Sequence, residues 1–202
     1  SHRFAVWQTH WSGKLARMPS QFRVALALCV ALTAACTSTR PPRPAPSPVL
    51  LGTVTHVTDG DTIKVQLQSG PIIVRLGSID APERDQPQGA EAAAALTRWV
   101  DGQPVELEVV SQDRYQRLVA VVSVHGKNIN ERLVKEGYAW AYRFFLTDRN
   151  YCRWEDAARR ARRGLWSMPT QAWIYPSDWR RLHKHEIAAV EDFSRETVEH
   201  CI

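Results

Sequence analysis

The stretch VTHVTDGDTIKV, residues 54–65, places two aspartates between two runs of β-forming residues. Asp59-Gly60, flanked by alternating apolar residues, is a strong signal for a hairpin turn. We therefore expect Asp59 and Gly60 to join two strands. Asp61 follows the turn immediately, and its carboxylate is a candidate metal ligand.

Short β-rich segments separated by turn signals continue this pattern. The expected strands are Leu51–Thr58, Thr62–Leu67, Ile72–Leu76, Pro104–Val110 and Leu118–Val124. The expected helices are Gly89–Val100, Asn128–Glu136 (with Gly137 after its end) and Tyr151–Arg163. This pattern predicts an α+β fold, mainly β, in which a five-stranded OB-type barrel carries three helices.

The composition of the 202 residues, 44% hydrophobic and 23% charged, is that of an ordinary globular protein. The net charge of +5 suits a polyanionic partner. Many unrelated proteins are equally basic, so charge alone selects no function class.

The first fifty residues differ from the rest of the chain. Within residues 1–36, Arg23 precedes an apolar run over 24–35 that is too short to span a bilayer and is typical of a secretory signal. The end of this leader resembles a bacterial lipobox, so Cys36 is a candidate for lipidation and a membrane tether. The Pro-rich residues 37–50 read as a linker. We expect an exported protein that is secreted, periplasmic or anchored to the cell envelope.

Residues 167–202 are expected to form a helical C-terminal extension beyond the domain at 51–166. Ser177 is a candidate N-cap, and apolar residues follow at roughly helical spacing: Leu182, Ala189, Phe193 and Val198. This helix could pack on the barrel or bind a partner. Cys152 and Cys201 could form a disulfide in an exported protein, or remain two thiols.

Two further clusters could carry chemistry. In VRLGSIDAPERDQ, residues 74–86, Asp80 and Glu83 flank a turn made rigid by Pro82, and Arg75 precedes them. In QDRYQRLVAVV, residues 112–122, Arg117 opens a strand. Read alone, the first cluster is equally consistent with a polar surface loop.

Together these residue types suit phosphodiester cleavage. A hard cation needs carboxylate and carbonyl oxygens, and an attacking water needs a base. Charge that develops on the phosphate needs fixed cations, and arginine binds phosphate oxygens in bidentate fashion.

The order and spacing of these motifs resemble the thermonuclease family, the staphylococcal-nuclease-like domains. The resemblance continues through INERLVKEGYAW, residues 129–140, and EDAARRARRGLW, residues 155–166, so it covers about 51–166. It implies that Asp61 and Asp80 bind Ca²⁺ together with the backbone carbonyl of Ala81, and that Thr62 supports the water shell of the metal. It also implies that Glu83 is the base for the attacking water, and that Arg75 and Arg117 grip the scissile phosphate. Tyr115 could stack on a base or ribose, or simply cover the barrel.

The sequence departs from the family pattern at three places. Ala81 replaces a threonine, which preserves the carbonyl ligand. The loop at 84–89 is short and lacks lysines. Gln116 replaces a glycine, and if that turn requires positive φ, glutamine costs about 1 kcal/mol.

Three functions compete. The first is an exported, calcium-dependent nuclease, acting as a monomer, that hydrolyses DNA and RNA with little sequence preference and leaves 3′-phosphate products. The second is a catalytically inactive OB-fold module that only binds nucleic acid. The third is an envelope-anchored interaction domain whose functional part is the C-terminal helix. All the expected acids and arginines are present, and this favours the enzyme.

Overall fold

The computed structural model describes residues 49–146, 148–190, 192 and 198–201. The leader, Cys36, nearly all of the Pro-rich linker and Phe193 lie outside the described residues. Within the described residues, no helix has both the length and the apolar character needed to cross a membrane.

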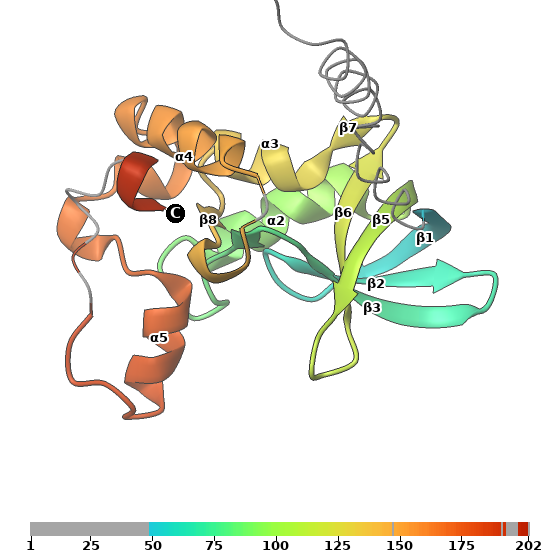
Figure 1. Ribbon diagram of the computed structural model, residues 1–202, viewed down its shortest axis with the longest axis horizontal. Coiled ribbons are helices and arrows are strands. Elements are labelled where there is room, and N and C mark those ends of the chain that lie inside the picture. Colours follow the sequence, from blue (N-terminus) through green and yellow to red (C-terminus); the bar gives the residue numbers. More distant parts are fainter. Residues whose placement is uncertain (1–48, 147, 191, 193–197, 202) are drawn as a thin grey trace, which may run out of the picture. The chain divides into compact units, whose positions relative to one another are not determined.

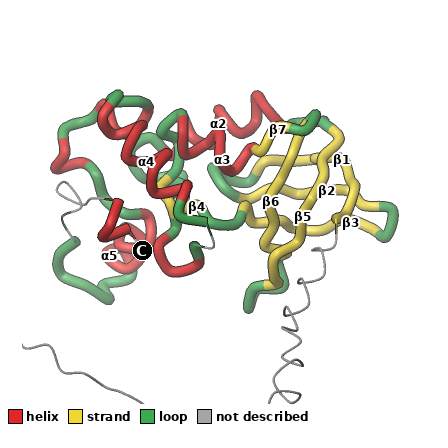
Figure 2. Tube along the Cα trace, turned by 45° about the horizontal axis from the view of Figure 1, so that its top comes forward, coloured by secondary structure: helices red, strands yellow, loops and turns green. Residues whose placement is uncertain are grey.

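Five strands form the barrel that the sequence predicts (Figures 1 and 2). They are β1 (Val49–Val57), β2 (Thr62–Leu67), β3 (Gly70–Leu76), β5 (Pro104–Gln112) and β6 (Leu118–Val124). Antiparallel pairing runs in the order β3-β2-β1-β5-β6, and a parallel pairing of β3 with β6 closes the barrel. The short β7 (Lys127–Asn128) extends the sheet beside β6. The mainly β, OB-type fold is therefore confirmed.

Alternation along the strands explains why they curl around a core. In β2, Ile63, Val65 and Leu67 are buried, whereas Lys64 and Gln66 between them are exposed. A side-chain period of two places every second residue on the same face of a sheet. The inward-facing side chains of the strands therefore fill the barrel interior.

Three helices cover the barrel and its end, close to their expected positions. They are α2 (Gly89–Val100), α3 (Ile129–Lys135) and α4 (Asn150–Arg160). Helix α2 packs against β1 and α3, and α3 packs against β6 and α4. The side chain of Asn128 caps α3 by accepting a hydrogen bond from the N–H of Glu131, and Gly137 has a φ of 78° just beyond the end of α3. Helix α4 ends earlier than expected, and Arg162 beyond it adopts a left-handed φ of 51°.

The C-terminal extension differs from its prediction. Helix α5 spans only Pro176–His183, and Tyr175 rather than Ser177 is its N-cap. Proline is favoured in the first turn of a helix, where its missing N–H has no partner to lose. The helix stops before His185, whose φ is 57°. Ala189 is exposed and outside any helix. The prediction of a helix that continues from Leu182 through Ala189 is therefore wrong beyond His183. Val198 lies in the 3-10 turn η4 (Val198–Cys201).

A second cluster of buried side chains joins the extension to the domain. Trp140 contacts Trp166 and Tyr175 edge-on, with ring centroids 4.5 Å and 5.2 Å apart. Trp140 belongs to the short strand β8 (Trp140–Ala141), which pairs with β4 (Ile79–Asp80). The Tyr175 hydroxyl donates to the carbonyl of Ala141, 3.2 Å away. The start of α5 is thereby fixed next to β8.

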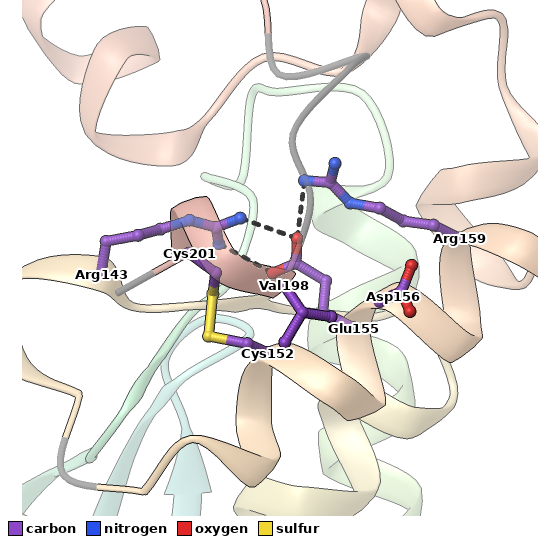
Figure 3. Close-up of a pocket in the computed structure, with 7 residues that line it drawn as sticks. All are labelled: Arg143, Cys152, Glu155, Asp156, Arg159, Val198 and Cys201. Carbon is purple, nitrogen blue, oxygen red and sulfur yellow. Dashed lines mark hydrogen bonds and ion pairs between the residues drawn. A yellow bond between two sulfur atoms is a disulfide. The ribbon is translucent and has the colours of Figure 1, made fainter. Parts of the chain in front are cut away.

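Glu155 in α4 binds both β8 and two arginines, Arg143 and Arg159, which lie beside it in Figure 3. Its carboxylate accepts from Arg143 Nη1 at 2.8 Å and from the Ala141 N–H at 2.7 Å, and it pairs with Arg159 at 2.6 Å. A disulfide between Cys152 and Cys201 ties η4 to the same helix, with 5.9 Å between the Cα atoms. Burial opposes ionisation of Glu155, but Arg143 and Arg159 outweigh it and lower the pKa of this carboxyl.

We expect Glu155→Gln to lower the free energy of unfolding by about 3–5 kcal/mol at neutral pH, because two buried arginines lose their counter-charge. A lowered folded-state pKa stabilises the protein above the ordinary value of 4.5, and this stability is lost as the pH falls through the folded-state pKa. Chemical denaturation as a function of pH should therefore show the two proteins converging in acid. Asp156→Asn is the control, since its partner Arg160 is exposed and its loss costs about 1 kcal/mol or less. A constant difference across the pH range would contradict the role of the Glu155 charge.

The β5–β6 hairpin contains the strain expected at Gln116. This residue has a φ of 63°, a conformation that favours glycine. Asp113 holds the turn together, because its Oδ1 accepts from the N–H groups of Tyr115 and Arg117 at 2.9 Å and 3.0 Å.

Gln116→Gly should raise the free energy of unfolding by about 1 kcal/mol, because it removes the left-handed strain. Gln116→Ala keeps a Cβ at the same φ and should bring no such gain. Urea denaturation of the three proteins measures both effects. Equal stability of the glycine and alanine variants would show that φ at this position carries no cost.

Candidate active site

Asp61 follows the β1–β2 turn and points to the end of the barrel. The turn is closed by the N–H of Thr58, which donates to the Thr62 carbonyl at 2.9 Å, and the Asp61 N–H donates to Asp59 Oδ1 at 3.0 Å. Asp59 thus shapes the turn, as its sequence context predicts. Burial and the nearby charge of Asp61 raise the pKa of Asp59 to about 6.

Gly60 is required in this turn because of close packing. A Cβ on Gly60 would lie 2.6 Å from the Cβ of Ala81 and 2.9 Å from the Cβ of Ala92. The turn that carries Asp61 therefore lies directly against the segment after Asp80 and against α2. The N–H of Ala81 donates to Asp61 Oδ2 at 3.3 Å, which links the two segments.

Asp80 lies in β4 and its side chain is completely buried. Arg75, at the end of β3, places one guanidinium nitrogen 2.8 Å from Asp80 Oδ1 and 3.1 Å from Asp61 Oδ2. Its other terminal nitrogen donates to the Ile79 carbonyl at 3.0 Å. Asp61 and Asp80 therefore converge on a single nitrogen atom of Arg75.

The electrostatics of these groups are tightly linked. Burial raises the pKa of Asp80 to about 6, although Arg180 and Arg75 act in the opposite direction. Burial lowers the pKa of Arg75, but the charges of Asp61 and Asp80 outweigh it and raise the pKa. Two carboxylates are thus held together by a shared cation, an arrangement that also suits a metal ion.

Glu83 lies in the loop between β4 and α2. The loop closes on itself, because the N–H of Gln86 donates to the Glu83 carbonyl at 2.9 Å and the Glu83 N–H donates to Gln86 Oε1 at 3.1 Å. Gly89 makes this closure sterically feasible, since a Cβ there would lie 1.8 Å from the Glu83 carbonyl oxygen. The Glu83 side chain is 32% exposed, so solvent reaches it.

Arg117 lies at the end of the β5–β6 turn, directly before β6, rather than within this carboxylate group. Arg75 pairs with Val119 in the parallel β3–β6 register, and Arg117 precedes Val119 by two residues in the chain. Its Nε forms an ion pair with Asp113 Oδ2 at 2.7 Å. Tyr115, on the same turn, is 65% exposed, with the guanidinium of Arg117 5.5 Å from its ring centroid.

Arg180 in α5 is a site residue that the sequence motifs do not indicate. Its guanidinium donates to Asp80 Oδ2 at 3.0 Å and forms an ion pair with Glu83. It follows Asp80 by a hundred positions, so only the tertiary structure brings it to the acids.

The donor set at this end of the barrel fits a hard cation in chemistry. Asp61 and Asp80 provide anionic oxygens, and the Ala81 carbonyl follows directly in the chain; Thr62 donates its hydroxyl to Asp61 Oδ1 at 3.0 Å and orients that carboxylate. In the part of the chain that the structure describes, no group of three or more His, Cys, Asp or Glu side chains forms a ready-made metal site. Arg75 and Arg180 lie between the acids instead.

The chain is similar to known nucleases. The family model of the staphylococcal nuclease homologues matches residues 73–168. An uncharacterized endonuclease of Haemophilus influenzae is 38% identical over 136 residues, which are 67% of this chain and 75% of that protein. A micrococcal nuclease of Shigella flexneri is 39% identical over 145 residues, with 66% of this chain and 82% of the relative covered.

Gly89→Ala should displace the Glu83 loop, because its Cβ would overlap the Glu83 carbonyl. We expect the free energy of unfolding to fall by about 1–3 kcal/mol, as in other overpacked sites. We also expect faster hydrogen exchange at the N–H groups of Gln86 and Gly89, which close the loop in the wild type.

Gly126→Ala is the matched control. Gly126 has a positive φ of 72° but open space around its Cβ position, so its substitution strains the backbone without touching the Glu83 loop. Unchanged exchange at Gln86 in Gly89→Ala would contradict the packing role of Gly89.

Proposed function

We propose that this chain, which belongs to the family of staphylococcal nuclease homologues, is a calcium-dependent nuclease that cleaves both DNA and RNA. The family and the similar nucleases identify it as an endonuclease that hydrolyses phosphodiester bonds. The observation that carries the finer proposal is the convergence of Asp61 and Asp80 on Arg75, with Glu83 linked to Asp80 through Arg180.

Asp61, Asp80 and the Ala81 carbonyl would hold Ca²⁺ in this proposal. Oxygen ligands of this kind suit a hard divalent cation. When bound, calcium supplies a Lewis acid that neutralises negative charge on the phosphate. Thr62 keeps the Asp61 carboxylate oriented through its hydroxyl.

Glu83 is the proposed base. Its partly exposed carboxylate can accept a proton from a water that attacks phosphorus, and the closed loop of residues 83–89 fixes its position. Hydrolysis at the 5′ P–O bond then leaves a 3′-phosphate on one product.

Arg75 and Arg117 are the proposed phosphate ligands. Arg75 lies in β3, and Arg117 directly precedes β6, which pairs with β3. Each guanidinium has a planar fork that matches two phosphate oxygens. Asp113 restricts the orientation of Arg117 through its ion pair. Fixed cations of this kind stabilise the charge that builds up in the transition state. Exposed Tyr115 is available for stacking on a base, which is tolerant of sequence.

We further propose that the enzyme is exported and acts as a monomer. The signal-like leader supports export, and so does the Cys152–Cys201 disulfide, because such bonds persist in oxidising compartments. A lipidated Cys36 would anchor the protein to a membrane.

The proposal is tested by incubating the full chain with single-stranded DNA and with RNA, in calcium or in a chelator. We expect cleavage only with calcium. Glu83→Gln should lower the cleavage rate by roughly 10²- to 10⁴-fold, as expected for loss of a general base. Its affinity for DNA, measured by fluorescence anisotropy, should change little.

Glu91→Gln is the control, because Glu91 is an exposed acid in the first turn of α2. Full activity of Glu83→Gln would overturn the assignment of the base. DNA binding by the wild type without cleavage under any metal condition would favour a module that only binds nucleic acid.

A further inference from the structure

Arg180 makes the most unusual contact in the active site. The side chain belongs to the C-terminal extension, outside the matched family region of residues 73–168. Yet it lies between two of the acids, 3.0 Å from Asp80 Oδ2 and in an ion pair with Glu83. Burial lowers the pKa of Arg180, but Asp80 and Glu83 outweigh this effect and raise the pKa, so the group stays charged.

The position of Arg180 is fixed by contacts on both sides. Gln86, in the loop that carries Glu83, donates its side-chain amide to the Ile174 carbonyl just before α5, at 2.7 Å. The indole N–H of Trp179 donates to Asp85 in the same loop at 3.2 Å. These contacts hold α5 against the loop that carries Glu83. The guanidinium of Arg180 therefore lies next to the acids because the helix is fixed there.

Arg180 occupies carboxylate oxygens of Asp80 that a metal ion would use as ligands. Arg75 donates to Oδ1 of this carboxylate, whereas Arg180 donates to Oδ2 at 3.0 Å and to Oδ1 at 3.3 Å and 3.4 Å. Because the Asp80 side chain is completely buried, it cannot turn outward to offer a different oxygen. A metal that approaches Asp80 therefore competes with these guanidinium contacts.

Of the two arginines, Arg180 is the easier to displace. Its side chain is 35% exposed, whereas that of Arg75 is 11% exposed. Arg75 is also held by the carbonyls of Leu76 and Ile79. The exposed part of the Arg180 side chain borders solvent, whereas Arg75 is enclosed.

We propose that Arg180 is an internal cation that stabilises the metal-free site and competes with calcium for Asp80 and Glu83. The inference rests on the calcium site proposed above. Calcium binding releases Arg180 from both carboxylates, which also frees Glu83 to act as a base. The extension thereby sets the calcium concentration at which the site becomes active.

The test measures calcium binding directly, by isothermal titration calorimetry on the full chain without substrate. Arg180→Ala should bind calcium about tenfold more tightly than the wild type, because the metal no longer displaces a charge-assisted hydrogen-bond donor. Arg180→Lys keeps the charge without the planar fork, and should have an intermediate affinity. Arg181→Ala is the matched control, since Arg181 is half-exposed on the same helix and pairs with Asp178.

Thermal unfolding provides a second readout. In chelator, Arg180→Ala should unfold at a lower temperature than the wild type, because its acids lack a counter-charge. Calcium should raise the unfolding temperature of Arg180→Ala more than that of the wild type, in line with tighter binding to the folded state. If Arg180→Ala does not fold in chelator, the calcium-induced rise in unfolding temperature is compared between Arg180→Lys and the wild type.

The outcomes separate the two proposals. Equal calcium affinity in the wild type and Arg180→Ala, or weaker binding in the variant, would overturn the competition while leaving the calcium site intact. No calcium binding by either protein would overturn the calcium assignment itself, and the competition with it.

Discussion

The shared guanidinium of Arg75 is the contact on which the active-site end of the molecule depends. Asp61 and Asp80 are both buried and would repel each other if left alone. Arg75 lies within 3.1 Å of both carboxylates and is itself fixed by two backbone carbonyls. This one side chain connects the β1–β2 turn, the end of β3 and β4. Loss of the cation would leave two charges without compensation in a region that water scarcely reaches.

The second cluster, around Trp140, adds to the frame that the barrel core builds around these acids. Asp80 pairs with Trp140 across the β4–β8 ladder, and β8 is held by Glu155 and by the Tyr175 hydroxyl. Because Tyr175 immediately precedes α5, the aromatic contacts that fix β8 also bring Arg180 to the acids. The extension is therefore part of the active-site structure and not an independent tail.

Local patterns explain what the sequence predicts correctly. Strand alternation and the turn residues define the barrel. The short motifs single out Asp61, Arg75 and Asp80, and the structure places these three side chains in contact, because each lies close in sequence to the turn that positions it. The sequence predicts the ends of α4 and α5 less well. Both helices end near a residue of positive φ, Arg162 and His185, and neither residue is the glycine that usually marks such a position.

Contacts between distant segments explain what the sequence does not predict. Gly60 suggests a turn from its context, but its actual constraint is the approach of Ala81 and Ala92. Arg180 is one of several arginines in a basic tail, and nothing in its neighbours distinguishes it. Arg180 contacts Asp80 because two sets of distant contacts place α5 beside the acids. They are the packing of Trp140 on Tyr175 and the hydrogen bond from Gln86 to the Ile174 carbonyl.

The balance of charge links stability to function at this site. Asp61, Asp80 and Glu83 face Arg75 and Arg180, which leaves one negative charge in excess. Such a site repels a polyanion, whereas a bound divalent cation would remove this repulsion. With Arg180 released into solvent, the three acids, Arg75 and the divalent cation would sum to zero. Arg75 would thus keep the clustered acids compensated both without metal and with it, and would remain in place to bind the phosphate.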